Sequence, residues 1–344
     1  MPILTQIRFG SPRRAGARWF AVTTELAHLP PGYTARRPTI DDAEAILALV
    51  HAQERATIGN EDSTLPEVRE LLSLRCTPPE TDHWLVMHGE VANAWAMVID
   101  DFGGEQIEID VYADPTHPRA VRETLYDLLL ERVREHATSR PNREVTVSVG
   151  VHVGDEHSAA ALLGRGFAVE RRFNRLRIEL EPGRPFPTAP DGVALQAFDP
   201  GSVSDWRDWH TLDDESFSDH WGHETISHDA FRQSVDTEED PELDRWRFAL
   251  VDGIRAGICQ MSGRFATEGG GWIRTLGVVA SARGRGAGRY LLEHALASYA
   301  SDGRKWAGLS VDTENVSGAL RLYESAGMRP WMQIDAYRRR VPAD

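Results

Sequence analysis

The chain has 344 residues, of which 41% are hydrophobic and 26% are charged, and its 53 acidic and 38 basic side chains give a formal charge of −15. This composition is that of a folded globular chain of about two domains, and it excludes a mainly disordered, fibrous or membrane-spanning protein. The negative charge disfavours nucleic acid and anionic membranes as partners. Because Cys76 and Cys259 are the only cysteines, we expect neither a disulfide framework nor a cysteine metal site. Residues 1–30 lack the apolar core of a secretory signal, so we expect a cytoplasmic location.

The first half of the chain predicts one α/β unit over residues 31–181, which follows an extension of unassigned role over residues 1–30. Apolar residues at helical spacing begin after the helix-start signal Thr39-Ile40-Asp41-Asp42. His88-Gly89 stands between two β-rich runs and predicts a hairpin turn. The other expected elements are a strand at 107–111, a helix through 125–133, a strand at 145–149, a short helix at 159–163 and a strand at 173–180.

The same order of elements returns in the second half, over residues 193–344, after a proline-rich linker at 182–192. The expected elements are helical stretches around Phe217 and Phe231, a hairpin on Asp252-Gly253, a strand at 272–279, a helix at 289–299, a strand at 308–311, a helix at 316–325 and a strand at 333–339. The two hairpin turns lie 164 residues apart, and the helix-closing glycines Gly166 and Gly327 lie 161 apart. Because two pairs of corresponding features are separated by nearly the same number of residues, the sequence indicates duplication of the α/β unit.

The most informative stretch is the loop at residues 283–288, which joins a strand to a helix and carries glycines at positions 284, 286 and 288. Glycines let backbone N–H groups converge on an anion, and the helix N-terminus adds partial positive charge. Arg283, Arg285 and Arg289 add full charges around the same loop. A Rossmann site would follow the first strand of its domain, and a nucleoside-triphosphate loop would need Gly-Lys-Ser/Thr, so neither fits. The pattern predicts a pyrophosphate cradle built largely from backbone.

Two motifs together resemble those of the GNAT superfamily of acyl-CoA-dependent N-acyltransferases. Arg283-x-x-Gly286-x-Gly288, after Leu276-x-Val278, is similar to its acetyl-CoA-binding motif. The segment at residues 315–328 is similar to its Asn-x-x-Ala-x-x-Leu-Tyr-x-x-x-Gly-Phe/Met sequence. Ala280 departs from the proline that many members carry. The resemblance is close over residues 245–330 and architectural elsewhere, where the tandem layout is similar to that of mycothiol synthase.

The resemblance implies an α/β (α+β) fold of two tandem GNAT-like domains, each a mixed, mostly antiparallel central sheet flanked by helices. It implies an N-acetyltransferase that uses acetyl-CoA as cosubstrate and needs no metal. Pantetheine would lie where two parallel strands splay apart. The implied cofactor-binding residues are Leu276, Gly277, Val278, Arg283, Gly284, Arg285, Gly286, Ala287, Gly288, Arg289 and Asn315.

The resemblance also gives Tyr323 the role of general acid, which protonates the thiolate that leaves. A phenol keeps its proton at neutral pH and can supply it. The alternative is that Tyr323 is a core residue on the apolar face of its helix. An alkylammonium acceptor must lose a proton before it attacks, so a general base is also required. Mycothiol synthases carry a glutamate on the strand before the loop, where this chain has Trp272, and this argues against mycothiol-type chemistry.

Candidate bases and acceptor-binding residues are acidic. Asp312, at the end of a strand, is one possible base, and the cluster of Asp213, Asp214, Glu215, Asp219 and His220 supplies others. Acids beside aromatic residues suit a cationic amine, which makes Asp214, Glu215, Asp219 and Trp221 candidate substrate-binding residues. Each acid could equally be a solvated surface residue.

The first half lacks the counterparts of these motifs. Leu162 and Gly154 stand where Tyr323 and Asn315 stand in the second half. The segment at 114–119 that matches the cradle has no glycine and has two prolines, which lack the N–H that a phosphate needs. We therefore expect a degenerate GNAT-like domain at 31–181 and a catalytic one at 193–344.

The leading hypothesis is acetyl transfer from acetyl-CoA to a primary amine of a small, cationic molecule by direct attack. One alternative is an acetyltransferase for protein N-termini or lysines, and another is a non-catalytic acyl-CoA sensor. We expect a monomer or homodimer. The sequence leaves the acceptor, the acyl chain length and the general base open.

Overall fold

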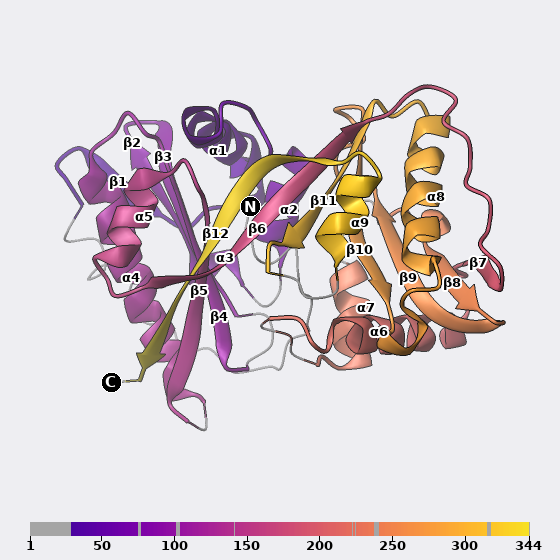
Figure 1. Cartoon of the computed structure of the whole chain (residues 1–344). Helices are drawn as coiled ribbons and strands as arrows, with labels where there is room; N and C mark the ends of the chain where they lie inside the picture. Colours follow the sequence, from indigo (N-terminus) through magenta and orange to yellow (C-terminus); the bar gives the residue numbers. More distant parts are fainter. Residues whose placement is uncertain are drawn as a thin grey trace. The chain divides into compact units, whose positions relative to one another are not determined.

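In the computed structural model, the described residues are 29–74, 77–100, 104–140, 142–221, 223, 225–236, 241–314 and 318–343. They form two compact units. The first contains the described residues up to Arg172 together with those from Gln333 onward, and the second contains Phe173–Met332. Figure 1 shows that each unit is built around a β-sheet with helices packed on it.

The first unit has the strand order β1-β2-β3-β4-β5-β12. Its strands are β1 (Tyr33–Arg36), β2 (His83–His88), β3 (Val91–Ile99), β4 (Gln106–Ala113), β5 (Glu144–His152) and the C-terminal β12 (Arg329–Pro342). Its helices are η2 (Ile40–Asp42), α1 (Ala43–Thr57), α2 (Leu65–Ser73), α3 (Pro79–Asp82), α4 (Arg119–Thr138) and α5 (Glu156–Leu163). Neighbouring strands are antiparallel except for β4 and β5, which are parallel.

Helices cover both faces of this sheet, so both faces are buried. Successive residues of a strand point to opposite faces and therefore pack in different apolar clusters. In β2, Trp84 and Val86 pack in one apolar cluster with α4, whereas Leu85 packs in another with α1 and α2. The helices contribute residues at helical spacing, such as Leu125 and Leu129 of α4. The alternation fixes the register of the strands.

The second unit has the strand order β6-β11-β10-β9-β8-β7. Its strands are β6 (Ala168–Glu179, which enters this unit at Phe173), β7 (Val193–Ala197), β8 (Arg247–Val251), β9 (Ile254–Ser262), β10 (Gly270–Val278) and β11 (Trp306–Asp312). Its helices are α6 (Val203–Phe217), α7 (His228–Asp236), η3 (Leu243–Arg245), η4 (Ala280–Ala282), α8 (Ala287–Ser301) and α9 (Ala319–Ser325). Here β10 and β11 are parallel, and the other neighbours are antiparallel.

Two glycines of β10 show that helices cover this sheet at very short range. A Cβ on Gly271 would lie 2.5 Å from the Tyr299 ring of α8, and a Cβ on Gly277 would lie 2.8 Å from Cβ of Ser216 in α6. Residues 271 and 277 therefore have no room for a side chain. The α8 face belongs to one apolar cluster, and the α6 face carries a second cluster rich in tryptophan that includes Trp209 and Trp246.

The repeated order confirms the tandem fold expected from the sequence, including both hairpins and one parallel strand pair in each unit. The compact units do not coincide with the expected limits 31–181 and 193–344, because the last strand of each half pairs in the sheet of the other. From Phe173 onward β6 pairs with β11, and β12 pairs with β5 from Ile334 onward. The helix expected at 316–325 is described only from Ala319.

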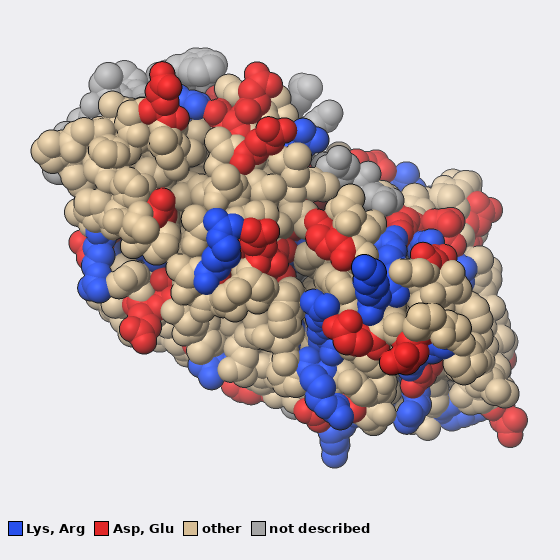
Figure 2. Space-filling model, turned by 90° about the horizontal axis from the view of Figure 1, so that it is seen from above, with Lys and Arg blue, Asp and Glu red and all other residues tan. Residues whose placement is uncertain are grey.

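Neither unit contains, among its described residues, a helix long and apolar enough to cross a bilayer. Within the same residues, no group of three or more His, Cys, Asp or Glu side chains is arranged to hold a metal ion. On the face drawn in Figure 2, arginine and lysine side chains are interspersed with aspartate and glutamate.

Candidate active site

The two parallel strands of the second unit diverge along their length. Pairing between β10 and β11 extends only from Gly270–Trp306 to Trp272–Gly308, although β10 continues to Val278 and β11 to Asp312. A β-bulge between Ile273 and Thr275 accompanies the loss of pairing. Beyond this point several residues of both strands are partly exposed, namely Thr275, Leu276, Val278, Ser310 and Asp312. The unpaired edges leave backbone groups free to bind an extended ligand.

The glycine-rich loop follows β10 and ends in helix α8. Gly284 and Gly286 have φ values of +80° and +84°, and Gly286 caps the helix. A Cβ on Gly286 would lie 3.1 Å from Cγ of Pro190, while Gly284 has nothing within 4 Å. The N–H of Arg283 donates to the Ala280 carbonyl at 3.3 Å, and among residues 284–290 the first N–H with a backbone partner is that of Tyr290, which donates to the Gly286 carbonyl at 2.9 Å. The preceding amides are therefore available donors at a helix N-terminus, where an anion binds well.

Each arginine of the loop contacts a carboxylate of the protein. Arg285 pairs with Asp252 at 3.1 Å, and Arg289 approaches Glu293 at 3.8 Å. Arg283 lies 3.4 Å from Asp219, and it also donates to the carbonyl oxygens of Val278 and Ser216 at 3.0 and 3.1 Å. Arg283 thus braces the end of β10 against α6. The three arginine charges expected around the loop are therefore partly neutralised by carboxylates of the protein.

Tyr323 lies on α9, and its side chain is 6% exposed within the cluster that includes α8 and β11 residues. Burial raises the pKa of Tyr323 well above its usual range, and the nearby Cys259 adds to the shift. The phenol therefore holds its proton at neutral pH. This position is compatible with both readings of the sequence, a core residue and a proton donor.

The expected acceptor-side residues are only partly brought together. Trp221 packs against Phe173 with ring centroids 6.2 Å apart, and Phe173 pairs with Asp312 across β6 and β11. Asp219 belongs to the same region through its contact with Arg283. Asp214 instead accepts a hydrogen bond from His223 at 2.8 Å, with the histidine as donor when Nε2 carries a proton.

Two further residues complete the expected set. Glu215 is exposed on α6, and Asn315 lies outside the described residues.

Asp213 is a titratable group that the sequence does not single out from its acidic neighbours. Burial, together with the charge of Asp214, raises the pKa of Asp213 to about 7. One turn of helix separates it from Trp209 and from Phe217, which lie four residues before and after it in α6. This i, i+4 spacing to two aromatic residues is the signal that could have placed Asp213 on the inner face.

Trp272, where related tandem enzymes are expected to carry a glutamate, is a packed core residue. It forms a cluster with Phe265 and Trp306, and a Cβ on Gly308 would lie 2.9 Å from its ring. Arg175 and Arg264 stack on the same ring, with guanidinium carbons 5.5 and 5.1 Å from its centroid. Any general base must therefore come from another position.

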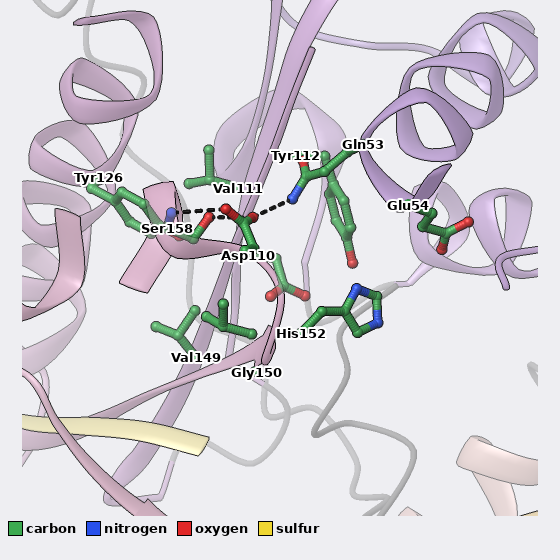
Figure 3. Close-up of a pocket in the computed structure, with 12 residues that line it drawn as sticks. Gln53, Glu54, Asp110, Val111, Tyr112, Tyr126, Val149, Gly150, His152 and Ser158 are labelled. Carbon is green, nitrogen blue, oxygen red and sulfur yellow. Dashed lines mark hydrogen bonds between the residues drawn. The ribbon is translucent and has the colours of Figure 1, made fainter. Parts of the chain in front are cut away.

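The corresponding strands of the first unit also diverge, but side chains fill the space between them. Pairing of β4 with β5 runs only from Gln106–Thr146 to Glu108–Ser148. Beyond it lies a cavity of about 20 Å³, lined by Asp110, His152 and ten other residues (Figure 3). That volume is about the space of one water molecule. A thioester arm has no room there.

In the first unit, the loop at residues 114–119 corresponds to the cradle, and some of its amides form hydrogen bonds within the loop. Asp114 accepts hydrogen bonds from the N–H of Thr116 at 2.8 Å through its carboxylate and from the N–H of His117 at 3.2 Å through its carbonyl. Pro115 and Pro118 have no N–H to donate. A hollow of about 570 Å³ lies beside this loop, and the Asp114 carboxylate accepts hydrogen bonds from both the N–H and the hydroxyl of Thr116.

Comparison with known proteins agrees with this geometry. The acetyltransferase (GNAT) family matches residues 206–328. Mycothiol acetyltransferase of Thermobispora bispora is 31% identical over 88% of this chain and 98% of its own length, and that of Streptomyces avermitilis is 28% identical over 88% and 90%. A GCN5-related N-acetyltransferase structure from Sphaerobacter thermophilus superposes with a TM-score of 0.75 at 25% identity, covering 91% of this chain and 97% of that chain. A tandem GNAT protein of the clavulanic acid biosynthesis pathway shares the fold, with a TM-score of 0.66 at 15% identity over 91% and 100%.

The tandem fold and the diverging strands beside an amide-lined loop define an N-acetyltransferase. The chain belongs to the GNAT acetyltransferase family, which uses acetyl-CoA. Within that family it shares the tandem layout of proteins named mycothiol acetyltransferases.

Proposed function

We propose that the second unit transfers an acetyl group from acetyl-CoA to a primary amine of a small, cationic molecule. The observation that carries the proposal is the loss of pairing between β10 and β11 directly before the loop at 283–288. An extended pantetheine arm can pair with the edge of β10 at Leu276–Val278, while the free amides before Tyr290 bind the pyrophosphate. Leu276, Gly277, Val278, the loop residues 284–289 and Asn315 make up the proposed cofactor site, and Arg283 holds the start of the loop against α6.

Tyr323 is the proposed general acid. The neutral amine attacks the thioester carbonyl carbon and forms a C–N bond, and collapse of the tetrahedral intermediate breaks the C–S bond. Tyr323 gives its proton to the departing sulfur, and the tyrosinate regains one from the acylated nitrogen. The burial that raises the pKa of Tyr323 keeps this proton in place until sulfur becomes basic.

The acidic and aromatic residues at the end of the diverging strands support a cationic acceptor. Asp219, Trp221 and Asp312 converge there through Arg283 and Phe173. A carboxylate and an indole face attract an ammonium group. The relatives named for mycothiol support a small-molecule acceptor rather than a protein. Asp214 and Glu215, on α6, would contribute longer-range negative charge.

The first unit is proposed to be a silent copy. Its diverging strands enclose about 20 Å³, and Asp114 accepts hydrogen bonds from the amides of Thr116 and His117 in its loop. It completes its own sheet with the C-terminal strand β12, so its contribution is to hold the chain's last strand and support the catalytic unit.

A panel of amines tests the proposal. The purified chain is mixed with acetyl-CoA and, separately, with a diamine, an aminosugar, an aminothiol and a peptide N-terminus, and thiol release is measured. We expect release that depends on a cationic small amine. Activity only on the peptide would favour a protein acetyltransferase, and slow hydrolysis without any acceptor would favour an acyl-CoA sensor.

A further inference from the structure

The segment Ser216–Trp221 bridges the ends of the two diverging strands. At its start, Ser216 and Phe217 pack on Gly277 of β10, where a Cβ would lie 2.8 and 3.0 Å from them. At its end, Trp221 packs on Phe173, whose pairing partner is Asp312 of β11. The segment is therefore attached to the β10 side at one end and to the β11 side at the other.

His220 lies between these two attachments. Its N–H donates to the Phe217 carbonyl at 2.9 Å, and its ring meets the Phe217 ring edge-on with centroids 4.7 Å apart. Four charged or titratable groups act electrostatically on the partly buried imidazole, namely Asp219 in the segment, His223 beyond its end, Arg283 after β10 and Asp312 at the end of β11. The ring is thus influenced by one charge from the loop after β10 and by one charge at the end of β11. The ring therefore belongs to the segment that bridges the ends of the strands between which the thioester is proposed to lie.

We propose that His220 is the general base that removes a proton from the acceptor ammonium, with Asp312 as the residue that stabilises the imidazolium formed. This inference rests on the proposed acetyl transfer. The second unit then supplies both proton-transfer groups, His220 on the acceptor side and Tyr323 on the thiol side.

The proton balance is simple. An unprotonated ring nitrogen of His220 takes one proton from R–NH₃⁺, which leaves the lone pair of R–NH₂ free to attack, and the imidazolium later releases that proton to solvent. Burial lowers the pKa of His220, with Arg283 and His223 acting in the same direction, so the ring is neutral and ready to accept at pH 7. The carboxylates of Asp219 and Asp312 act in the opposite direction and favour the imidazolium once it forms.

Asp213 is the rival for this role, because its pKa of about 7 also suits a base. Its position differs, since it lies within α6, whereas His220 lies on the bridging segment. The pKa of Asp213 is raised by burial and by Asp214, whereas the ring of His220 is influenced by charges of the loop after β10 and of the end of β11.

The test is the pH dependence of kcat/KM in His220→Gln, with the most active small amine from the panel whose pKa is near 10. An enzyme with a base works on the ammonium form, so wild-type kcat/KM should level off above about pH 7. Without the base only the free amine reacts, and its fraction rises tenfold per pH unit up to the amine pKa. We expect the variant to lose about 100-fold at pH 7 and less than about threefold at pH 9.5.

The matched control is His294→Gln in α8, another partly buried histidine whose pKa is lowered by burial and whose ring packs on one aromatic residue. It should keep the wild-type profile. Acetyl-CoA affinity should be unchanged in both variants. The inference would be overturned if kcat/KM of His220→Gln fell by the same factor at every pH, or if its plateau equalled that of the wild type. It would also be overturned if Asp213→Asn lost the plateau and His220→Gln did not.

A second variant covers the case in which His220→Gln does not fold. Asp312→Asn removes a charge that raises the pKa of His220, so the imidazole of the variant should lose its proton at a lower pH. The fall of kcat/KM on the acid side of the pH profile (the acid limb) should therefore move to lower pH. An unmoved limb would contradict the pairing of the two residues. If the wild-type chain acetylates no amine in the panel, the proposed function fails and this inference fails with it. If the wild type turns over and His220→Gln has the same pH profile, only the assignment of His220 as the base is refuted.

Discussion

The guanidinium of Arg283 donates from Nε to the carbonyl oxygen of Val278 at 3.0 Å. A second donor of the same side chain reaches the carbonyl of Ser216, and a third contacts Asp219. The residue therefore joins the end of strand β10 to the end of helix α6 and to the segment that follows it. Its place in the loop motif suggested a phosphate contact, but its observed partners make it a brace between the cofactor side and the acceptor side.

Replacing Arg283 with glutamine should consequently harm acceptor use more than cofactor binding. Loss of the brace frees the segment Ser216–Trp221, which carries the proposed acceptor contacts. We expect kcat/KM for the amine to fall about tenfold or more, while the Kd for acetyl-CoA changes less than about threefold, since a mispositioned group typically costs rate rather than binding elsewhere. Initial rates at varied amine, combined with calorimetry, separate the two. The reverse pattern would show that Arg283 acts on phosphate.

Gly286→Ala tests the conformation of the loop. At φ +84° an alanine is strained by about 1–2 kcal/mol, and its Cβ would press on Pro190 at 3.1 Å. The loop should relax away from the geometry that points its amides at one anion, and acetyl-CoA affinity should fall about tenfold or more. Gly303→Ala is the control, because Gly303 has φ +76° in open space after α8. Equal affinity loss in both variants would mean that general strain, not the cradle, is responsible.

Tyr323→Phe keeps the ring that packs in the core and removes only the proton donor. Because burial holds the phenol neutral, the variant should fold normally and bind acetyl-CoA with unchanged Kd. Turnover should fall about tenfold or more, as expected for loss of a general acid. Single-turnover measurements of thiol release check this. A wild-type rate would leave Tyr323 as a core residue only.

Asp213 predicts a pH-dependent stability. Its pKa is about 7 in the folded chain and about 4 when unfolded, so between these values the folded state binds one proton more. Stability of the wild type should therefore fall as pH rises from about 4 to about 7 and then level off. Asp213→Asn removes this dependence. The free energy of unfolding of the variant relative to the wild type should therefore increase as pH rises over that range, by an amount on the order of 1–4 kcal/mol. Tm measured from pH 4 to 8 tests it, and a constant difference would contradict the burial of a charged group.

Local signals predicted the parts of the structure that depend on neighbouring residues. The turn at Asp252-Gly253 and the glycine loop before α8 are set by backbone preference within a few residues, and both lie where the sequence placed them. The exchange of β6 and β12 between the two sheets was not predicted, because strand partners far apart in sequence leave no local trace.

The candidate site likewise contains features that the local sequence predicts and features that depend on tertiary packing. The loop could be predicted directly, since its glycines stand at alternate positions within one short segment of the sequence. The brace formed by Arg283 and the approach of His220 to Asp312 depend on how α6 packs over Gly277, which periodicity alone does not determine. The partial burial of Asp213 similarly follows from tertiary packing around α6.

The central claim is that the amides around residues 284–289 bind the pyrophosphate of acetyl-CoA in the second unit alone. Isothermal titration of the full chain with acetyl-CoA tests it most directly, with Gly286→Ala titrated in parallel. The account predicts one equivalent bound per chain and a marked loss of affinity in the variant. Absence of heat, two equivalent sites per chain, or binding that Gly286→Ala leaves intact would contradict it.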